Sequence, residues 1–328
     1  QLVAQSQSVS RMKLTGFSVA FISVFITLCN CALIYDEYST KAEVLDRRRR
    51  VTHGFAADKD DYRWQVSLQT YEIIGDYYKH YCGATLIAGR WVLSAGHCVR
   101  NREPEDVFAL VGSYHVKTPE TAVIGVSKIF RHPEYQAPNK DISLLLLKEE
   151  VPLNRFDKAS HADVIQLPLQ YYVPDDACNM TGWGRLERKG PTPSVLMYTR
   201  VEMMPHEKCA HIFRNATNIT DFMLCFGGRD GDACQGDSGG PLACRNSSNV
   251  YLAGIASFGV GCATPGVPGV YTRLDKFADW INNTIHGEYL KEADQEKILN
   301  VTEEERVITS KDTETRSYDS SLRFPLFI

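Results

Sequence analysis

The chain has 328 residues, of which 44% are hydrophobic and 23% are charged. This composition is sufficient for one large hydrophobic core or two joined ones, and it excludes a disordered or collagen-like chain. With 36 basic and 40 acidic side chains the net charge is −4, which argues against a nucleic-acid-binding protein that depends on a basic surface. The excess negative charge belongs to residues 286–328, which carry ten acidic and six basic side chains, whereas residues 1–285 are balanced.

The N-terminal segment has the features of a secretory signal peptide. Met12 and Lys13 precede a mostly apolar run over residues 14–34, with small residues close to its end, and this order of a cationic start and an apolar core is typical of a signal. We therefore interpret residues 1–34 as upstream residues and a signal peptide, and expect a secreted, extracellular protein. A retained signal anchor is the alternative, because the run is long enough to span a bilayer. Contact with a membrane is expected only in that case.

Residues 35–50 are polar and end in four consecutive arginines, the last of which is Arg50. Such a run is commonly a solvated surface or a localisation patch. In an exported chain, directly before Val51, it is better explained as a proteolytic cleavage site. We expect residues 35–50 to be a propeptide.

After residue 50 the sequence changes to short apolar runs, for example over residues 64–68, 107–111, 142–147 and 250–256. Gly, Pro and Asn separate these runs at short intervals, which predicts an antiparallel β-sandwich or barrel rather than alternating strands and helices. Near the end, Phe277, Trp280, Ile281 and Ile285 follow helical spacing, which predicts one amphipathic helix. We expect a globular domain over 51–285 and an acidic, flexible tail over 286–328.

Ten cysteines are present, two of them in the signal region and eight in the body, and an even number fits a disulfide framework. No CxxC motif and no tight Cys/His cluster suggests zinc. Sequons also fit secretion, and we expect glycosylation at Asn215, Asn218, Asn246, Asn282 and Asn300. The sequon at Asn179 lies beside Cys178, where core packing is expected to prevent glycosylation.

Three short motifs can carry chemistry. Gly236-Asp237-Ser238-Gly239 places a serine between residues that allow a tight turn, so that the hydroxyl is exposed and backbone N–H groups can converge. The other two are His97, in Ser-Ala-Gly-His-Cys, and Asp141, at the head of an apolar run. Each alone has an ordinary structural explanation, as a glycine-rich loop, a surface histidine or a strand-start acid. Their joint occurrence in the order His, Asp, Ser favours nucleophilic catalysis.

On these motifs the chain resembles trypsin-like members of the chymotrypsin family of serine proteases over about residues 51–285. The resemblance implies an all-β fold of two antiparallel six-stranded β-barrels with a C-terminal helix. It implies that Ser238 is the nucleophile, His97 the general base and then acid, and Asp141 the group that orients the imidazole. The backbone N–H groups of Gly236 and Ser238 would form the oxyanion hole, and peptide bonds would be hydrolysed through an acyl-enzyme.

The same resemblance implies four disulfides that use all eight body cysteines and leave none to tether a light chain. These pairs are Cys82–Cys98, Cys178–Cys244, Cys209–Cys225 and Cys234–Cys262.

Substrate specificity is likewise implied by the resemblance. Asp232 corresponds to the carboxylate at the floor of the primary pocket, which favours Arg or Lys because an unpaired buried charge is costly. The alternative is that Asp232 is an acidic residue on an exposed loop. Ala233 lacks a hydroxyl that could serve Lys, so Arg is expected to be preferred over Lys. Gly259 and Gly269 would form the pocket walls, and the segment Ser257-Phe258-Gly259 would pair with substrate backbone. Expected partners are protein or peptide substrates with Arg or Lys at the cleaved bond and protein protease inhibitors, with no cofactor, no metal and no nucleic acid.

The resemblance also implies a zymogen. Cleavage between Arg50 and Val51 would free the Val51 amine to pair with Asp237. Three departures from the family pattern are present: His53 for glycine, Gly96 for alanine, and Phe258 for tryptophan. The first two favour the rival hypothesis of a catalytically silent homologue that acts as a binding protein. The tyrosine-rich segment Tyr71–Tyr81 is expected to be an extended loop on the leaving-group side that tunes substrate choice.

Overall fold

The computed structural model describes residues 54–118, 121, 123–153, 162–168, 177–227, 233–245, 249–295 and 297. Several predictions of the sequence fall outside these residues. They are the signal peptide, the propeptide, the end of the acidic tail, and the residues Arg50, Val51, His53, Asp232, Asn246 and Asn300.

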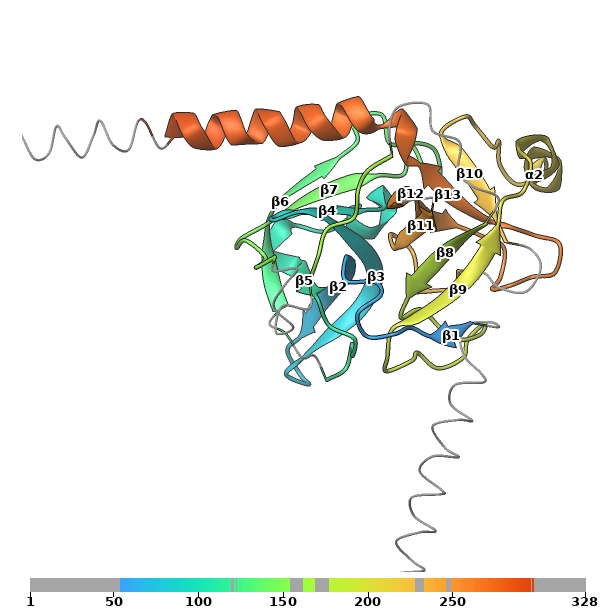
Figure 1. Ribbon diagram of the computed structural model, residues 1–328, viewed down its shortest axis with the longest axis horizontal. Helices are drawn as coiled ribbons and strands as arrows, with labels where there is room; N and C mark the ends of the chain where they lie inside the picture. Colours follow the sequence, from blue (N-terminus) through green and yellow to red (C-terminus); the bar gives the residue numbers. More distant parts are fainter. Residues whose placement is uncertain are drawn as a thin grey trace, which may run out of the picture. The chain divides into compact units, whose positions relative to one another are not determined.

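The first half of the described chain forms a closed six-stranded antiparallel barrel (Figure 1). Its strands are neighbours in the order β2-β3-β4-β7-β6-β5. Apolar side chains such as Leu68, Trp91 and Leu145 fill its buried interior, as expected for the short apolar runs of the sequence. The strands are β2 (Gln65–Glu72), β3 (Tyr77–Ala88), β4 (Trp91–Ser94), β5 (Phe108–Val111), β6 (Val123–Arg131) and β7 (Ser143–Leu147).

The second half forms a row of six antiparallel strands in the order β9-β8-β11-β12-β13-β10. The two ends of this row meet, because Met203 forms a bridge with Phe226 and the Met204 N–H donates to the Cys225 carbonyl at 2.8 Å. The short strand β1 (Phe55–Ala56) adds to the outside of β9. The predicted pair of six-stranded barrels is therefore confirmed. The strands are β8 (Ala177–Gly182), β9 (Met197–Glu202), β10 (Met223–Phe226), β11 (Pro241–Arg245), β12 (Val250–Phe258) and β13 (Gly269–Arg273).

Helices are few. Short 3-10 helices occupy η1 (Gly96–Val99), η2 (Pro104–Asp106) and η3 (Leu274–Lys276), and one α-helix, α2 (His206–Phe213), precedes β10. The predicted C-terminal helix covers residues 278–295. Phe277 and Ile281 are buried at its start, against the core of the first barrel.

This C-terminal helix continues ten residues beyond residue 285, where the acidic tail was expected to begin. Glu288 is only 3% exposed and pairs with Lys128 of β6, while Glu292 pairs with Arg90 at 3.2 Å. Tyr289 packs edge-on against Trp91, with ring centroids 6.5 Å apart. Acidic residues of the supposed tail thus hold a packed helix on the first barrel.

All four disulfides implied by the resemblance are present: Cys82–Cys98, Cys178–Cys244, Cys209–Cys225 and Cys234–Cys262. The sulfurs of Cys82 and Cys98 lie near His97, but their disulfide leaves no thiolate to bind a metal. The segment expected to be an extended loop over Tyr71–Tyr81 is instead a β-hairpin, in which β2 and β3 pair up to Glu72 and Tyr77. Within the described ranges, no helix has both the length and the apolar character needed to cross a bilayer.

Candidate active site

Strand pairing in the first barrel brings His97 and Asp141 together. Ser94, at the end of β4, lies opposite Ser143, at the start of β7. His97 follows three residues after Ser94, in η1, and Asp141 precedes Ser143 by two, so both project from the same edge of the barrel. Arg131 supports η1 from β6, because its guanidinium donates to the carbonyls of Val99 and Arg100 at 3.2 and 2.6 Å.

The two oxygens of the Asp141 carboxylate hold His97 at its imidazole and at its backbone N–H. His97 Nδ1 lies 2.7 Å from Asp141 Oδ2, and the His97 backbone N–H donates to Oδ1 at 2.8 Å. Because a carboxylate only accepts hydrogen bonds, Nδ1 carries the proton and Nε2 of the neutral ring is left as a proton acceptor. Asp141 is 3% exposed, so this hydrogen bond is screened little by solvent.

Two hydroxyl groups of the second barrel complete the surroundings of Asp141. Ser257 Oγ, in β12, donates to Asp141 Oδ2 at 2.6 Å, and Thr272 Oγ1, in β13, donates to the Asp141 carbonyl at 2.7 Å. The site therefore joins the two barrels. Ser257 was expected only to bind substrate, and Thr272 was not predicted because no motif marks it.

Ser238 lies on the loop before β11, against the Cys82–Cys98 disulfide. Its carbonyl accepts from the Gly83 N–H at 2.8 Å and lies 3.5 Å from Cys98 Sγ. The same sulfur lies 3.7 Å from His97 Nε2. Among the described atoms, no hydrogen bond joins His97 Nε2 to Ser238 Oγ. The structure thus gathers all three residues of the predicted triad at one junction, with the His–Asp link formed.

The loop that carries Gly236 is anchored by a partly buried histidine that sequence reasoning missed. His80 Nε2 lies 2.9 Å from the Gly236 carbonyl, and His80 Nδ1 lies 2.8 Å from Ser67 Oγ. Burial lowers the pKa of His80 to about 4, so the ring is neutral at pH 7. A carbonyl only accepts, so Nε2 carries the proton and Nδ1 accepts from the serine hydroxyl. The positive φ of Gly236, +104°, is a conformation that favours glycine.

Asp237 points into the protein and is 1% exposed. Its two oxygens accept from the Gly184 N–H at 2.8 Å and the Cys234 N–H at 2.9 Å. Burial raises the pKa of this carboxyl to about 6, despite those bonds. A Cβ on Gly184 would overlap the carboxylate, so that glycine provides the space for it.

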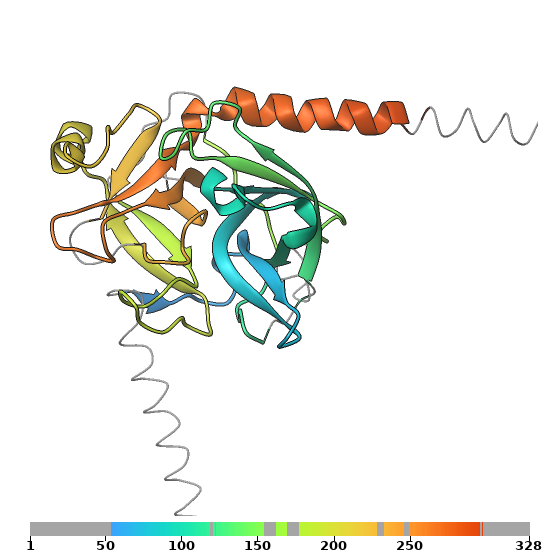
Figure 2. The same cartoon turned by 180° about the vertical axis from the view of Figure 1, so that it is seen from behind.

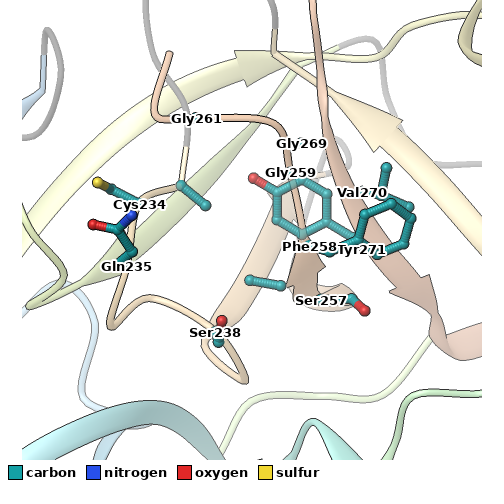
Figure 3. A pocket seen from close by; sticks show the side chains of 12 residues that line it. Cys234, Gln235, Ser238, Ser257, Phe258, Gly259, Gly261, Gly269, Val270 and Tyr271 are labelled. Atoms are coloured by element: carbon teal, nitrogen blue, oxygen red, sulfur yellow. The ribbon is translucent and has the colours of Figure 1, made fainter. Parts of the chain in front are cut away.

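A cavity of about 260 Å³ opens beside Ser238. In Figure 3 the Cys234–Gln235 segment faces the Gly259 and Gly269 segment across the cavity. A Cβ on Gly259 would have Gly269 Cα as its nearest neighbour, at 3.8 Å, so these two glycines leave the wall open. The predicted lining residues Ala233, Ser257, Phe258, Gly259 and Gly269 all contribute, whereas Asp232 lies outside the described residues. The sequence did not predict Gln235, Gly261, Val270 and Tyr271.

His97, Asp141 and Ser238 lie at the junction of the two barrels, beside a cavity, as the resemblance to chymotrypsin-like serine proteases implies. A comparison with protein families agrees, since the family described as Trypsin matches residues 51–281. The chain belongs to the trypsin family.

A search of curated proteins finds "Serine proteinase stubble" of Drosophila melanogaster, which is 37% identical over 243 residues. The match covers 71% of this chain but only 30% of that protein. The chain therefore spans less than a third of the length of this relative.

Two details of the described residues bear on the remaining predictions. A Cβ on Gly96 would lie 3.3 Å from Asp141 Oδ1, a tight contact beside the carboxylate that glycine avoids. Asn179 Nδ2 donates to the Tyr62 hydroxyl at 3.1 Å, which supports the expectation that its sequon is unused. Asn215, Asn218 and Asn282 are exposed, and their glycosylation stays a prediction.

Proposed function

We propose that this protein is a secreted zymogen of an endopeptidase that hydrolyses peptide bonds after Arg, and less efficiently after Lys. The observation that carries the proposal is the glycine-walled cavity beside Ser238. The first residue of its lining in chain order is Ala233, which directly follows Asp232. A carboxylate in such a partly dry cavity favours a guanidinium, which can satisfy it with two hydrogen bonds.

The chemistry follows from the geometry of His97. Ser238 Oγ attacks the substrate carbonyl carbon while Nε2 takes the hydroxyl proton, and the Asp141 carboxylate stabilises the resulting imidazolium. The N–H groups of Gly236 and Ser238 stabilise the oxyanion of the tetrahedral intermediate. His97 then returns the proton to the leaving amine as the C–N bond breaks, which leaves an acyl-enzyme. Water, activated by the same imidazole, hydrolyses the ester and restores Ser238.

Activation by cleavage at Arg50–Val51 is supported by Asp237. Asp237 is 1% exposed, and within the described ranges its oxygens accept from two neutral backbone N–H groups. Such a carboxyl group is costly to ionise, and its raised pKa reflects this. A cationic amine is the partner that would offset the cost. We propose that the freed amine of Val51 supplies it, which orders Gly236 and the adjoining cavity.

Secretion is supported by the four disulfides, which persist in oxidising compartments. Residues 1–34 are proposed to be upstream residues and a signal peptide and 35–50 a propeptide. Protein substrates and protein protease inhibitors are the proposed partners.

The test is a comparison of small amide substrates after cleavage behind Arg50 has been verified by mass spectrometry. We expect the order Arg, then Lys, with Phe and Ala far slower, and no turnover by Ser238→Ala. A preference for Phe would contradict the role given to Asp232. No turnover of any substrate by the cleaved chain would favour the silent homologue.

A further inference from the structure

Three consecutive residues at the end of the β6–β7 connection each contact the second barrel. In Figure 2 the two barrels lie side by side, the first coloured blue to green and the second yellow to orange. Asn139 Oδ1 accepts from Thr220 Oγ1 at 2.9 Å, just before β10. Lys140 Nζ lies 4.7 Å from the centroid of the Phe222 ring. The third residue, Asp141, accepts the two hydroxyl hydrogen bonds from β12 and β13 described above.

The backbone of Lys140 is strained. Its φ is +53°, in the left-handed region that a lysine seldom adopts. Its carbonyl accepts from the Ile142 N–H at 3.0 Å, and this bond closes a γ-turn centred on Asp141. A strained conformation persists only where the surrounding structure holds it. The direction in which the Asp141 side chain leaves the turn therefore depends on what holds Lys140.

The side chain of Lys140 is well placed to hold this turn. It is only 15% exposed, and its ammonium group pairs with Glu134 while it lies over the Phe222 ring. An aromatic face attracts a cation, and more strongly when the cation is sheltered from water. Phe222 itself is fixed to the second barrel, because its carbonyl accepts from the Arg273 N–H at 2.9 Å. Its ring also packs on Phe277, with centroids 5.6 Å apart.

We propose that Lys140 is a positioning residue for Asp141: its cation holds the strained turn against Phe222 and thereby fixes the carboxylate that orients His97. Lys140 does not line the cavity beside Ser238, so it acts through Asp141 rather than on the substrate. A displaced catalytic group slows the chemical step without weakening substrate binding. The inference rests on the proposed function, because its kinetic test uses turnover of an Arg substrate.

The kinetic test measures kcat and KM of the cleaved chain on a short Arg amide. Lys140→Met keeps the apolar stem of the side chain but removes the cation, whereas Lys140→Arg keeps a cation that stacks on aromatic rings. Lys128→Met is the matched control. It also removes a first-barrel lysine that pairs with a glutamate, but that glutamate is Glu288 of the C-terminal helix. The control therefore reports the effect of lost stability alone.

We expect Lys140→Met to lower kcat about tenfold, with KM within about twofold of the wild type. Lys140→Arg should keep about half of kcat or more, and Lys128→Met should lower the unfolding temperature but not kcat. The comparison is made on the alkaline plateau of the pH profile, where His97 is neutral in every variant, so that a changed charge near the imidazole does not account for the loss. A loss confined to KM, or an equal loss of kcat in Lys128→Met, would overturn the inference.

A double-mutant cycle tests whether the cation acts through the aromatic ring. Phe222→Leu removes the ring and should lower kcat by a factor similar to that of Lys140→Met. When both substitutions are combined, the second should change kcat by less than about twofold, because the interaction that it removes is already lost. Losses that simply multiply would show that Lys140 does not act through Phe222, and would contradict the inference.

Hydrogen exchange separates this inference from the proposed function, because it needs no turnover. The His97 N–H donates to the Asp141 carboxylate and the Ile142 N–H to the Lys140 carbonyl, and NMR follows the exchange of both amides in the Ser238→Ala background. We expect Lys140→Met to speed both exchanges more than Lys128→Met does. That result supports the inference even if no Arg substrate is cleaved, an outcome that would remove the proposed function alone. Unchanged exchange together with normal turnover would overturn the inference and leave the proposed function intact.

Discussion

Ser257 Oγ and His97 Nδ1 share one oxygen of Asp141, at 2.6 and 2.7 Å from Oδ2. Ser257 belongs to the second barrel, whereas His97 and Asp141 belong to the first. The orientation of the imidazole therefore depends on both barrels, since a carboxylate that accepts several hydrogen bonds has few orientations left.

Removing the Ser257 hydroxyl tests this dependence. We expect Ser257→Ala to lower kcat roughly tenfold, because the lost hydrogen bond, worth about 1–1.5 kcal/mol, leaves the carboxylate freer to rotate. Thr272→Val is the control, since Thr272 bonds the Asp141 carbonyl rather than its carboxylate. Steady-state kinetics on the short Arg amide measures both. A larger loss of kcat in Thr272→Val than in Ser257→Ala would contradict the account.

Gly184 is predicted to be required for the position of Asp237. A Cβ at residue 184 would overlap the carboxylate, whereas a Cβ at Gly190 would overlap Glu187 Cγ, part of a flexible surface side chain. Gly184→Ala is therefore expected to reduce kcat/KM of the cleaved chain by two or more orders of magnitude. Each tenfold loss corresponds to ~1.4 kcal/mol of activation free energy. Gly190→Ala should stay within about threefold of the wild type. Similar activities of the two variants would argue against the role of Asp237.

The raised pKa of Asp237 predicts the pH dependence of the uncleaved chain. Its folded pKa of about 6 exceeds the unfolded value of 3.8, so between these pH values the folded protein holds a proton that the unfolded chain has lost. The free energy of unfolding therefore falls as pH rises through this window, by up to about 3 kcal/mol.

Urea unfolding of the wild type and Asp237→Asn at pH 4 and pH 7 measures this contribution. The asparagine variant should lack it, so the wild type should lose more stability than the variant on going to pH 7. His80 has the opposite effect, because its folded pKa of about 4 lies below the unfolded 6.5, but it is common to both proteins and cancels in the difference. A difference that does not change with pH would refute the assignment.

The C-terminal helix is predicted to stabilise the first barrel through Glu288. In Lys128→Met the cation that remains beside this 3% exposed carboxylate, within the part of the chain that the structure describes, is Lys291, at 3.5 Å. The substitution should lower the free energy of unfolding by about 1–2 kcal/mol. Lys297→Met breaks the Lys297–Asp294 pair, in which both side chains are exposed, and should cost less than ~0.5 kcal/mol. Thermal unfolding compares them. Equal stabilities would mean that the Lys128–Glu288 pair does not stabilise the barrel.

Local motifs and apolar spacing predicted much of this molecule. The short apolar runs predicted an antiparallel β-sandwich or barrel, whereas the two six-stranded barrels, the four disulfides and the gathering of His97, Asp141 and Ser238 were predicted from the resemblance to trypsin-like proteases. Contacts between residues far apart without a motif were not predictable. His80 and Gly236 are 156 residues apart, and nothing local marks a histidine in a tyrosine-rich strand as a support for a distant loop.

The end of the C-terminal helix was missed for a different reason. Apolar spacing stops at Ile285, and Gly287 weakens the helical pattern. Beyond Ile285 the helix is held by Glu288 and Glu292, which pair with Lys128 and Arg90 of the first barrel. Apolar spacing alone predicts that these acidic side chains are solvated, because it gives no information on the lysine and the arginine with which they pair.

The most direct test of the central claim is acylation by a guanidinobenzoate ester, whose arginine-like acyl group forms a slowly hydrolysed ester with a serine nucleophile. We predict one acyl group per molecule, located on Ser238 by mass spectrometry, with a matching burst of released alcohol. The burst should appear only after cleavage at Arg50–Val51, and Ser238→Ala should show none. Acylation of the Ser238→Ala variant, or a cleaved wild type that is never acylated, would contradict the account.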